Sequence, residues 1–253
     1  MKKIILVIAA AIGLQACAST LTMNPLPKNG QKEIYDSGVG TIISEKKGSV
    51  VALRPSASRY ESTQRPQVIL SVLNNTSKPF DISTSNIRVF VDGEPTKVFT
   101  YEELVAEVKR KQTMLAIAAG LSAVADGVNA ANAGYSRQTG TVSVYGNGGY
   151  RGYGTYSSTT YNAAAARQAQ AAANARAQAN FASISRNAEV SLSGLSATML
   201  RRTTVMPHSW QGGYIEFDKI PKPNEPHEIT IQVDVAGKTH EVSFKHEKVN
   251  QNI

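Results

Sequence analysis

The residues with the most direct chemistry in this chain are one cysteine and four histidines. His240 and His246 fall on one face of a continuous strand, but six residues at about 3.3 Å each separate them by roughly 20 Å. They therefore cannot share one metal ion, and we expect no metal site. Because Cys17 is the only cysteine, no internal disulfide can form, so its thiol is free, paired between chains or modified.

Catalytic signatures are missing from the rest of the sequence. It contains no HExxH helix, Walker loop, nucleophile elbow or clustered set of acidic ligands. The glycines of 146–154 do not follow a strand and open a helix, as a dinucleotide-binding turn would. Trp210, near the bend at Pro207, is interpreted as a core residue at a sheet edge rather than as a ligand platform. We therefore expect a protein that is not an enzyme and that uses no cofactor.

The N-terminal segment predicts export from the cytoplasm. Lys2 and Lys3 precede an uncharged apolar stretch from Ile4 to Leu14. This stretch is too short to span a bilayer, for which about 20 apolar residues are needed, and it is typical of a secretory signal. We therefore expect residues 1–16 to be removed from the mature protein.

The tetrapeptide Leu14-Gln15-Ala16-Cys17 closes this segment and resembles the lipobox of bacterial lipoproteins. The resemblance implies signal cleavage between Ala16 and Cys17, and acylation of Cys17 at its thiol and its new amino group. An ordinary signal peptide with a spare thiol is the alternative. In lipoproteins an aspartate after the cysteine favours inner-membrane retention, so Ala18 implies the outer membrane, facing the periplasm or the cell surface. The first expected partner is the membrane, because each buried methylene contributes about 0.8 kcal/mol.

Strand signals occupy two separated ranges, 34–100 and 200–248. In the first range, residues 87–91 alternate and meet an Asp-Gly hairpin turn, after which 98–101 is the expected returning strand. In the second range, residues 229–245 form an alternating hairpin with an Ala-Gly-Lys turn. Such alternation predicts antiparallel strands with one face on a core.

Short alternating strands at this spacing favour a β-sandwich. The order strand, Asn-Asn-Thr turn, strand, Asp-Gly turn, Pro-x-x-x-x-Gly-Gly-Tyr and final hairpin resembles the immunoglobulin-like modules of small bacterial lipoproteins. We expect a mainly β fold, an immunoglobulin-like antiparallel β-sandwich that is interrupted by a long Ala-rich α-helical hairpin. Residues 17–33, with Pro25 and Pro27 and little periodicity, are predicted to be a lipidated tether.

Residues 101–199 differ in composition from the strand-rich ranges and predict the helical hairpin. Acidic residues open the first arm, as the helix dipole favours, and alanines dominate both arms. Such faces allow the arms to pack on each other or on another copy. The tip, 134–161, is rich in Gly, Tyr, Ser and Thr, and two interpretations stay open, a β-hairpin or a flexible Tyr-studded loop.

Glycines at 120, 127 and 134 are seven residues apart. They predict either a smooth stripe for helix contact inside the hairpin or a shallow membrane insertion. Asp126, Ser122 and Asn129 oppose insertion.

Tyrosines and arginines of the insertion are the candidate interaction residues. No acidic residue occurs between Asp126 and Glu189, so the arginines are suited to anionic lipid or cell-wall acids, whereas nucleic acid is not expected. The alternative is that spaced arginines only keep a helix soluble. Tyrosine and glycine together suit adaptable recognition. The candidates are Tyr145, Tyr150, Tyr153, Tyr156, Arg151, Arg167, Arg176 and Arg186.

These features predict a lipid-anchored envelope protein with a structural or partner-binding role, whose partner is another copy or another envelope protein. One alternative is an oligomeric outer-membrane pore or secretion-system accessory whose hairpins enter the bilayer. Another is a surface-displayed adhesin that presents the Gly/Tyr tip.

Overall fold

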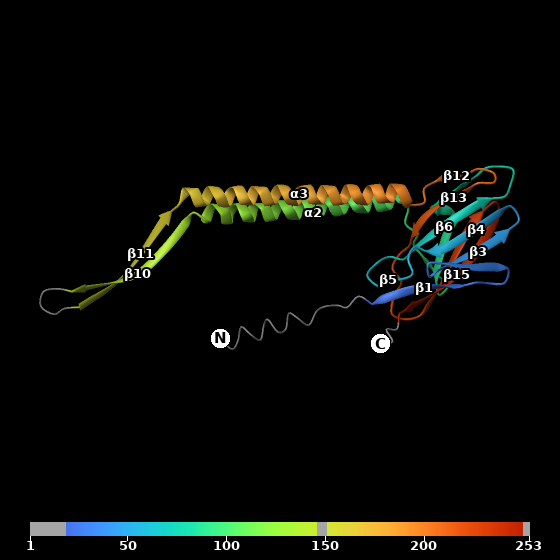
Figure 1. The fold of residues 1–253 in the computed structure, drawn as a ribbon, viewed down its shortest axis with the longest axis horizontal. Helices are drawn as coiled ribbons and strands as arrows, with labels where there is room; N and C mark the ends of the chain where they lie inside the picture. Colours follow the sequence, from blue (N-terminus) through green and yellow to red (C-terminus); the bar gives the residue numbers. More distant parts are fainter. Residues whose placement is uncertain (1–18, 146–150, 250–253) are drawn as a thin grey trace. The chain divides into compact units, whose positions relative to one another are not determined.

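The computed structural model describes residues 19–145 and 151–249. These residues fall into two compact units. The first, which we call the two-sheet body, contains the chain up to Leu104 and from Leu195 onward; the second, the helical unit, is Val105–Gly194. The described secondary structure is mainly β, in antiparallel sheets, with two α-helices (Figure 1).

The two-sheet body is built from short strands that pair antiparallel. They are β1 (Thr20–Leu26), β2 (Gln31–Asp36), β3 (Val39–Lys46), β4 (Ser49–Pro55), β5 (Tyr60–Glu61), β6 (Gln67–Asn74), β7 (Phe80–Ile82), β8 (Ile87–Val91), β9 (Glu94–Thr96), β12 (Thr203–Val205), β13 (Trp210–Glu216), β14 (His227–Val235) and β15 (Lys238–Lys248). One sheet has six strands in the order β5-β1-β15-β14-β8-β9, and another has five in the order β13-β6-β4-β3-β2. A small sheet pairs β12 with β7, and a 3₁₀ turn, η2 (Thr84–Asn86), leads into β8.

Side chains from both large sheets form one hydrophobic core. Along β14, Ile229 and Ile231 are fully buried while the intervening Thr230 is not, and Leu53 and Leu70 enter the same core from the other sheet. Each such burial contributes roughly 1.5–3 kcal/mol. The alternation expected for 229–235 and the mainly β character of the chain are thus confirmed.

Two-residue turns set the register of the hairpins. Asp92 and Gly93 have φ of 51° and 85°, and Ala236 and Gly237 have φ of 49° and 70°. Two successive residues with positive φ give the type I′ turn, whose twist matches that of paired strands. The Asp-Gly turn is where the sequence places it, but the returning strand is β9, not residues 98–101.

Helix α2 (Tyr101–Asn132) explains why residues 98–101 do not form the returning strand. The Thr100 hydroxyl accepts from the Glu103 backbone N–H at 3.2 Å, and the Glu103 carboxylate accepts from the Thr100 N–H at 2.9 Å. This reciprocal capping box starts the helix at Tyr101. Val98 contributes only a single bridge to Phe217.

The predicted tether at 17–33 is wrong for its described part. β1 pairs with β15 from Leu21 to Leu26, and Leu21 and Met23 are buried in the body. Pro25 suggested an unstructured segment, because proline lacks the N–H that a strand with two neighbours needs. β5 pairs only with Thr20 and Leu21, so at Pro25 the strand β1 has no neighbour on that side. A proline is tolerated at such an edge, since the missing N–H would not bond there.

Trp210 corrects a second prediction. It opens β13, which is an outer strand of its sheet, so the edge position holds. Its side chain is 51% exposed, however, and is not part of the core. The buried position on this strand is Ile215, because the first half of β13 is exposed.

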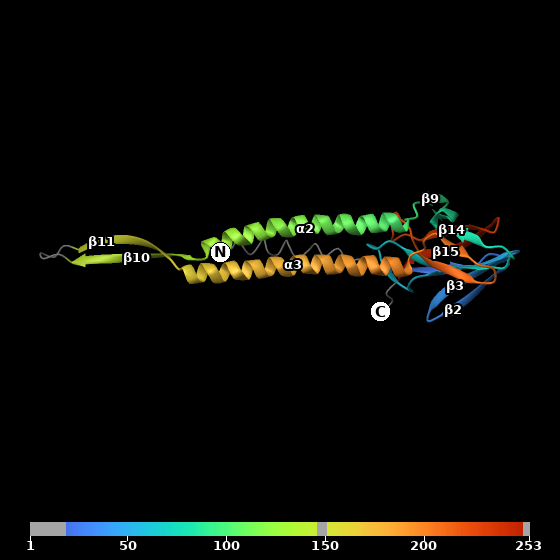
Figure 2. The same cartoon turned by 90° about the horizontal axis from the view of Figure 1, so that it is seen from above.

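The helical unit contains most of α2, a two-stranded sheet of β10 (Tyr135–Tyr145) and β11 (Arg151–Tyr161), and most of α3 (Ala163–Thr198). The helices lie side by side (Figures 1 and 2). β10 and β11 pair antiparallel along their whole length, so of the two interpretations of the tip the β-hairpin is correct. Asn162 caps α3, because its side-chain oxygen accepts from the N–H groups of Ala164 and Ala165.

Gly134 joins α2 to β10 through a close approach. A Cβ at this position would lie 2.6 Å from the Tyr161 ring and 2.9 Å from the Ala166 methyl group. The Gly134 carbonyl accepts from the Asn162 N–H at 2.7 Å. Only glycine fits between these neighbours, so this residue fixes the junction of helices and hairpin.

Candidate functional site

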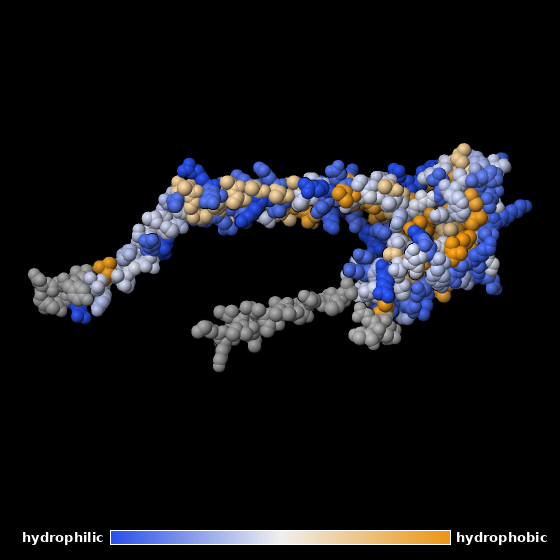
Figure 3. Space-filling view, viewed as in Figure 1, coloured by the Kyte–Doolittle hydropathy of each residue, from blue (hydrophilic) through white to orange (hydrophobic). Residues whose placement is uncertain are grey.

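Five large apolar side chains of α2 form an uncovered stripe, which we call the outer stripe. Its spacing of three, four, three and four residues confines it to an arc of about 80° on a helix with 3.6 residues per turn. Each side chain is 58–70% exposed: Met114, Ile117, Leu121, Val124 and Val128. Figure 3 shows apolar side chains at the surface of the helices. A row of exposed large apolar residues is a candidate contact surface.

The opposite face of α2 carries small residues, which we call the inner face. Ala116, Ala119 and Ala123 are only partly exposed, and Ala130 is buried. The buried residues of α3 are also alanines, namely Ala166, Ala173 and Ala188. The buried positions of both helices are therefore small residues, whereas the large apolar side chains of the outer stripe are exposed.

By length and composition alone, α2 is long and apolar enough to cross a membrane. Only 6% of its most apolar 18-residue window is buried. The sequence predicts either packing inside a hairpin or contact with lipid for this segment. The apolar side chains of α2 are accessible, so the structure does not decide between the two.

The arginines on α3 do not gather into one basic patch. Arg167, Arg176 and Arg186 are all exposed. Separations of nine and ten residues turn the helix by about 180° and 280°, so the three guanidinium groups point in different directions. Arg167 also donates from Nε to the carbonyl of Ala163 at 3.2 Å. This arrangement fits spaced, solubilising charges better than a single anion site.

The tyrosines of the tip are not brought together either. Tyr153 and Tyr156, which are 77% and 51% exposed, are three residues apart on β11 and so lie on opposite faces of the ribbon. Tyr156 covers Gly140, where an added Cβ would lie 2.5 Å from its ring. Tyr145 pairs with Arg151 in the register of the hairpin. Tyr150, Ala16 and Cys17 lie outside the described residues.

Two histidines of the body form a cluster that the sequence analysis missed. His227 and His246 are paired across β14 and β15, with ring centroids 5.7 Å apart. The signal was present in the sequence, since the two residues are equally far from the turn at Ala236-Gly237. The spacing of His240 and His246 along one strand does not reveal this pair, because His227 and His246 meet across the hairpin.

The hydrogen bonds of His246 define its proton state. The buried ring contacts the Pro223 carbonyl through Nε2 at 2.9 Å and the Tyr60 hydroxyl through Nδ1 at 2.7 Å. Because the carbonyl can only accept, Nε2 carries the proton, and in the neutral ring Nδ1 accepts from Tyr60. Burial lowers the pKa of His246, against a smaller opposing effect of the Pro223 carbonyl, and burial raises the pKa of Tyr60.

His227 has the opposite preference. Its Nδ1 lies 2.6 Å from the Asp92 carboxylate and its Nε2 lies 3.2 Å from the Lys222 carbonyl. Both partners are acceptors, so both ring nitrogens donate and the ring is an imidazolium. Burial opposes this charge, but the bonds to Asp92 and Lys222 outweigh it and raise the pKa of His227.

All four ring nitrogens of the cluster are thus engaged with protein partners. A metal ion or a proton-transfer role would require one of these hydrogen bonds to break. Across the described residues, no group of three or more His, Cys, Asp or Glu side chains is placed to hold a metal ion. His240 is likewise buried and bonded, to Ser49 at 2.8 Å and Ser44 at 3.0 Å. These histidines hold strands together.

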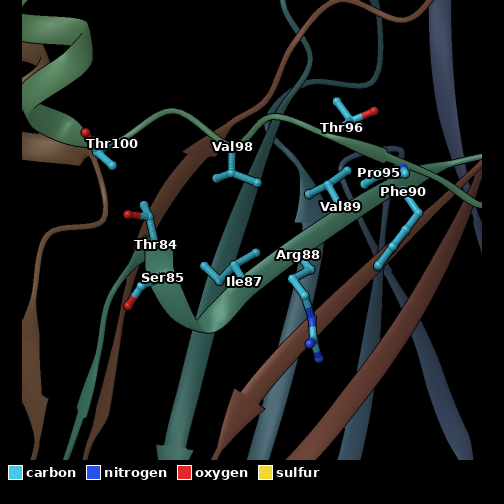
Figure 4. Close-up of a pocket in the computed structure, with 10 residues that line it drawn as sticks. All are labelled: Thr84, Ser85, Ile87, Arg88, Val89, Phe90, Pro95, Thr96, Val98 and Thr100. Carbon is cyan, nitrogen blue, oxygen red and sulfur yellow. The ribbon is translucent and has the colours of Figure 1, made fainter.

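A hollow of about 420 Å³ lies beside β8, β9 and the segment that leads to α2 (Figure 4). Its charged lining residue, Arg88, pairs with Asp234 at 2.9 Å. The lining offers hydroxyl and apolar groups without an adjacent base, so it indicates no catalytic chemistry. The lining residues are Thr84, Ser85, Ile87, Arg88, Val89, Phe90, Pro95, Thr96, Val98 and Thr100.

Comparison with known proteins adds no relative, since no family model, curated protein or solved structure matches the chain.

Proposed function

We propose that this protein is a lipid-anchored envelope protein with a non-enzymatic, partner-binding role, and that the helical unit makes the contact. The outer stripe carries this proposal. Five large apolar side chains are exposed on a helix whose partly or fully buried inner face carries alanines. Burying such a side chain is worth roughly 1.5–3 kcal/mol, so a partner that covers the stripe gains most of its binding energy there.

A photoreactive amino acid at Leu121, introduced into the full chain in intact bacteria, tests this role. We expect a cross-linked protein adduct on irradiation. The same amino acid at Ser122 is the matched control, because this neighbouring residue is exposed but points about 100° away. Adducts with lipid alone, or equal protein adducts at both positions, would contradict a partner-binding stripe.

The lipid anchor rests on Leu14-Gln15-Ala16-Cys17 and the basic, apolar segment before it. Cys17→Ser is expected to leave the protein unacylated and to release it from membranes, since acyl chains supply the anchoring energy. Ala18→Asp is the matched variant, which should stay acylated but shift from the outer to the inner membrane. Mass spectrometry of the N-terminus and membrane fractionation measure both. A membrane-bound Cys17→Ser protein of unchanged mass would exclude the anchor.

We further propose that the two-sheet body is immunoglobulin-like. The support is a pair of antiparallel sheets on one core, with hairpins at β3–β4, β8–β9 and β14–β15. An experimental structure tests this assignment by its strand order and its crossovers between the sheets.

An oligomeric pore is the second candidate, and the β10–β11 hairpin is the observation that favours it. Each strand has 11 residues, which matches the roughly 9–11 residues of a membrane-crossing β-strand. Purified, acylated protein added to planar lipid bilayers should then give stepwise conductance that is lost when 136–160 is replaced by a short turn. Intact bilayers without conductance would count against a pore and leave the partner-binding role standing.

A further inference from the structure

We infer that the outer stripe is a coiled-coil seam whose partner is α2 of a second copy of this chain. This inference rests on the proposed partner-binding role and names the partner. It goes beyond that role because it specifies which side chains interlock and what kind of surface they meet.

The spacing of the stripe is that of a coiled coil. Met114, Leu121 and Val128 recur every seven residues, and Ile117 and Val124 fall between them. This is the a and d pattern that brings two helices together along a left-handed seam. All five side chains are exposed, so no other part of the described chain covers the seam.

Glycines beside the seam provide a second observation. Gly120 and Gly127 lie inside α2, where each costs about 1 kcal/mol of helix stability relative to alanine. A Cβ on either residue would meet nothing within 4 Å, whereas a Cβ on Gly134 would strike Tyr161 and Ala166. Packing within the chain therefore does not require these two glycines. They occupy the g positions that flank a seam, where a helix that approaches closely needs small residues.

Charge and symmetry favour an identical helix as the partner. Leu121 is seven residues from Met114 and seven from Val128, so the stripe can face a copy of itself across a two-fold axis. Residues 112–125 carry no charge, and the flanking e positions are Ala118 and Ala125. Charged e and g residues set the choice and the orientation of a coiled-coil partner. In this uncharged stretch no charge repulsion opposes the pairing of two identical seams. A lipid partner would not explain the glycines, because lipid chains adapt to larger side chains.

The seam spans only two heptads, so its affinity in dilute solution is expected to be low. Confinement to a membrane raises the effective concentration of one copy around another. The pairing is therefore best measured in the bacterial envelope with the full chain, before any extraction by detergent.

Disulfide trapping provides the test. Leu121→Cys, oxidised in intact cells, should form a covalent dimer on non-reducing gels, because Cα atoms must approach to about 5.5–6 Å. Ser122→Cys is the matched control, and we expect about tenfold less dimer from it because its side chain leaves the seam. The parent chain, whose sole thiol is Cys17, sets the background.

Further variants separate the orientation and the specificity of the pair. Met114→Cys cross-links to itself in a parallel pair, and to Val128→Cys on a coexpressed chain in an antiparallel pair; either result supports the seam. Adding Ile117→Asp to Leu121→Cys should abolish the dimer without unfolding α2, because residue 117 is 58% exposed.

The outcomes distinguish this inference from the proposed function. Equal dimer from Leu121→Cys and Ser122→Cys, or none from either, overturns the self-association. If the photoreactive residue at 121 then captures a protein of different mass, the partner-binding role survives with another partner. If it captures only lipid, both proposals fail.

Discussion

His227 and His246 differ in proton state although they stand side by side. Asp92 holds one ring charged, while burial holds the other neutral against the smaller opposing effect of the Pro223 carbonyl. This asymmetry avoids placing two positive charges 5.7 Å apart. It also makes the stability of the body depend on pH in two opposite ways.

Asp92→Asn tests the charged partner and should preserve the type I′ turn, since asparagine tolerates positive φ. The pKa of His227 is raised in the folded body, so its stabilisation is present below its ordinary value of about 6.5 and is lost as pH rises through the raised pKa. The pKa of Asp92 is lowered, chiefly by the bond to His227, so its stabilisation is present above about 3.9 and is lost as pH falls through its lowered pKa.

The variant should therefore lose stability mainly between about pH 4 and pH 6.5, by no more than about 1 kcal/mol because Asp92 is exposed. Urea unfolding at about pH 5.5 and about pH 8.5 measures the difference. A larger loss at the higher pH would contradict the assigned charge of His227.

Tyr60→Phe tests the neutral partner. Removing the hydroxyl leaves Nδ1 of the buried His246 without its 2.7 Å hydrogen bond. An unsatisfied buried acceptor costs about 1–3 kcal/mol, so the midpoint of urea unfolding should fall at neutral pH. Tyr35→Phe, at a 65% exposed position of β2, is the control and should stay within about 0.5 kcal/mol. Equal effects of the two changes would show that the hydroxyl of Tyr60 contributes nothing.

Helix α2 carries two rows of side chains that differ in size and in exposure. Ala116, Ala119, Ala123 and Ala130 lie on the partly or fully buried inner face, and five larger, exposed side chains form the outer stripe. The glycines at 120 and 127 belong to neither row, so helix stability and helix association can be changed in opposite directions.

Gly120→Ala together with Gly127→Ala tests that separation. In the single chain each change should stabilise α2 by up to about 1 kcal/mol, because alanine favours a helix and the added Cβ meets open space. Circular dichroism during thermal unfolding measures this gain. In the Leu121→Cys background the same changes should weaken disulfide dimers, because the added methyl groups hold the two helices apart. Gly134→Ala is the contrasting variant and should lose stability, since its Cβ would strike Tyr161.

Sequence patterns identify these elements only where local signals agree with the tertiary contacts. The hairpin of β14 and β15 was predictable because its alternation and its turn both indicate one register. β1 was not, because Pro25 is typical of a loop unless the strand lies at an edge. The heptad spacing of α2 is visible in the sequence, but which of its faces α3 covers depends on long-range packing.

At the scale of the whole molecule, the hydrophobic core and the outer stripe belong to different units of the chain. The core of the two-sheet body uses no residue of Val105–Gly194. Leu104 and Leu195, where the helical unit begins and ends, belong to one small cluster with Phe99 and Met199. The body therefore closes on itself without help from the insertion.

Replacing residues 105–194 by a short Gly-Ser linker tests this independence. Because Leu104 and Leu195 share a cluster, a few residues suffice to connect them. We expect the shortened protein to keep its β-type circular dichroism and a cooperative urea transition. It should also keep its membrane fractionation, since Cys17 is retained, while its dimer trapping is lost. A body that unfolds on excision would show that the helical unit stabilises it.

The seven-residue repeat of α2 has one more consequence, for variation in length. Insertion of seven residues into α2 and seven into α3 would return every later side chain to within about 20° of its original direction and lengthen the helices by about 10 Å. Insertion of five would instead rotate every later side chain by about 140° and turn the two rows away from their original directions. Related chains should therefore differ in the length of these two helices by whole seven-residue repeats. For the same reason, protein engineers can extend the helical hairpin in steps of seven residues or graft it onto another scaffold.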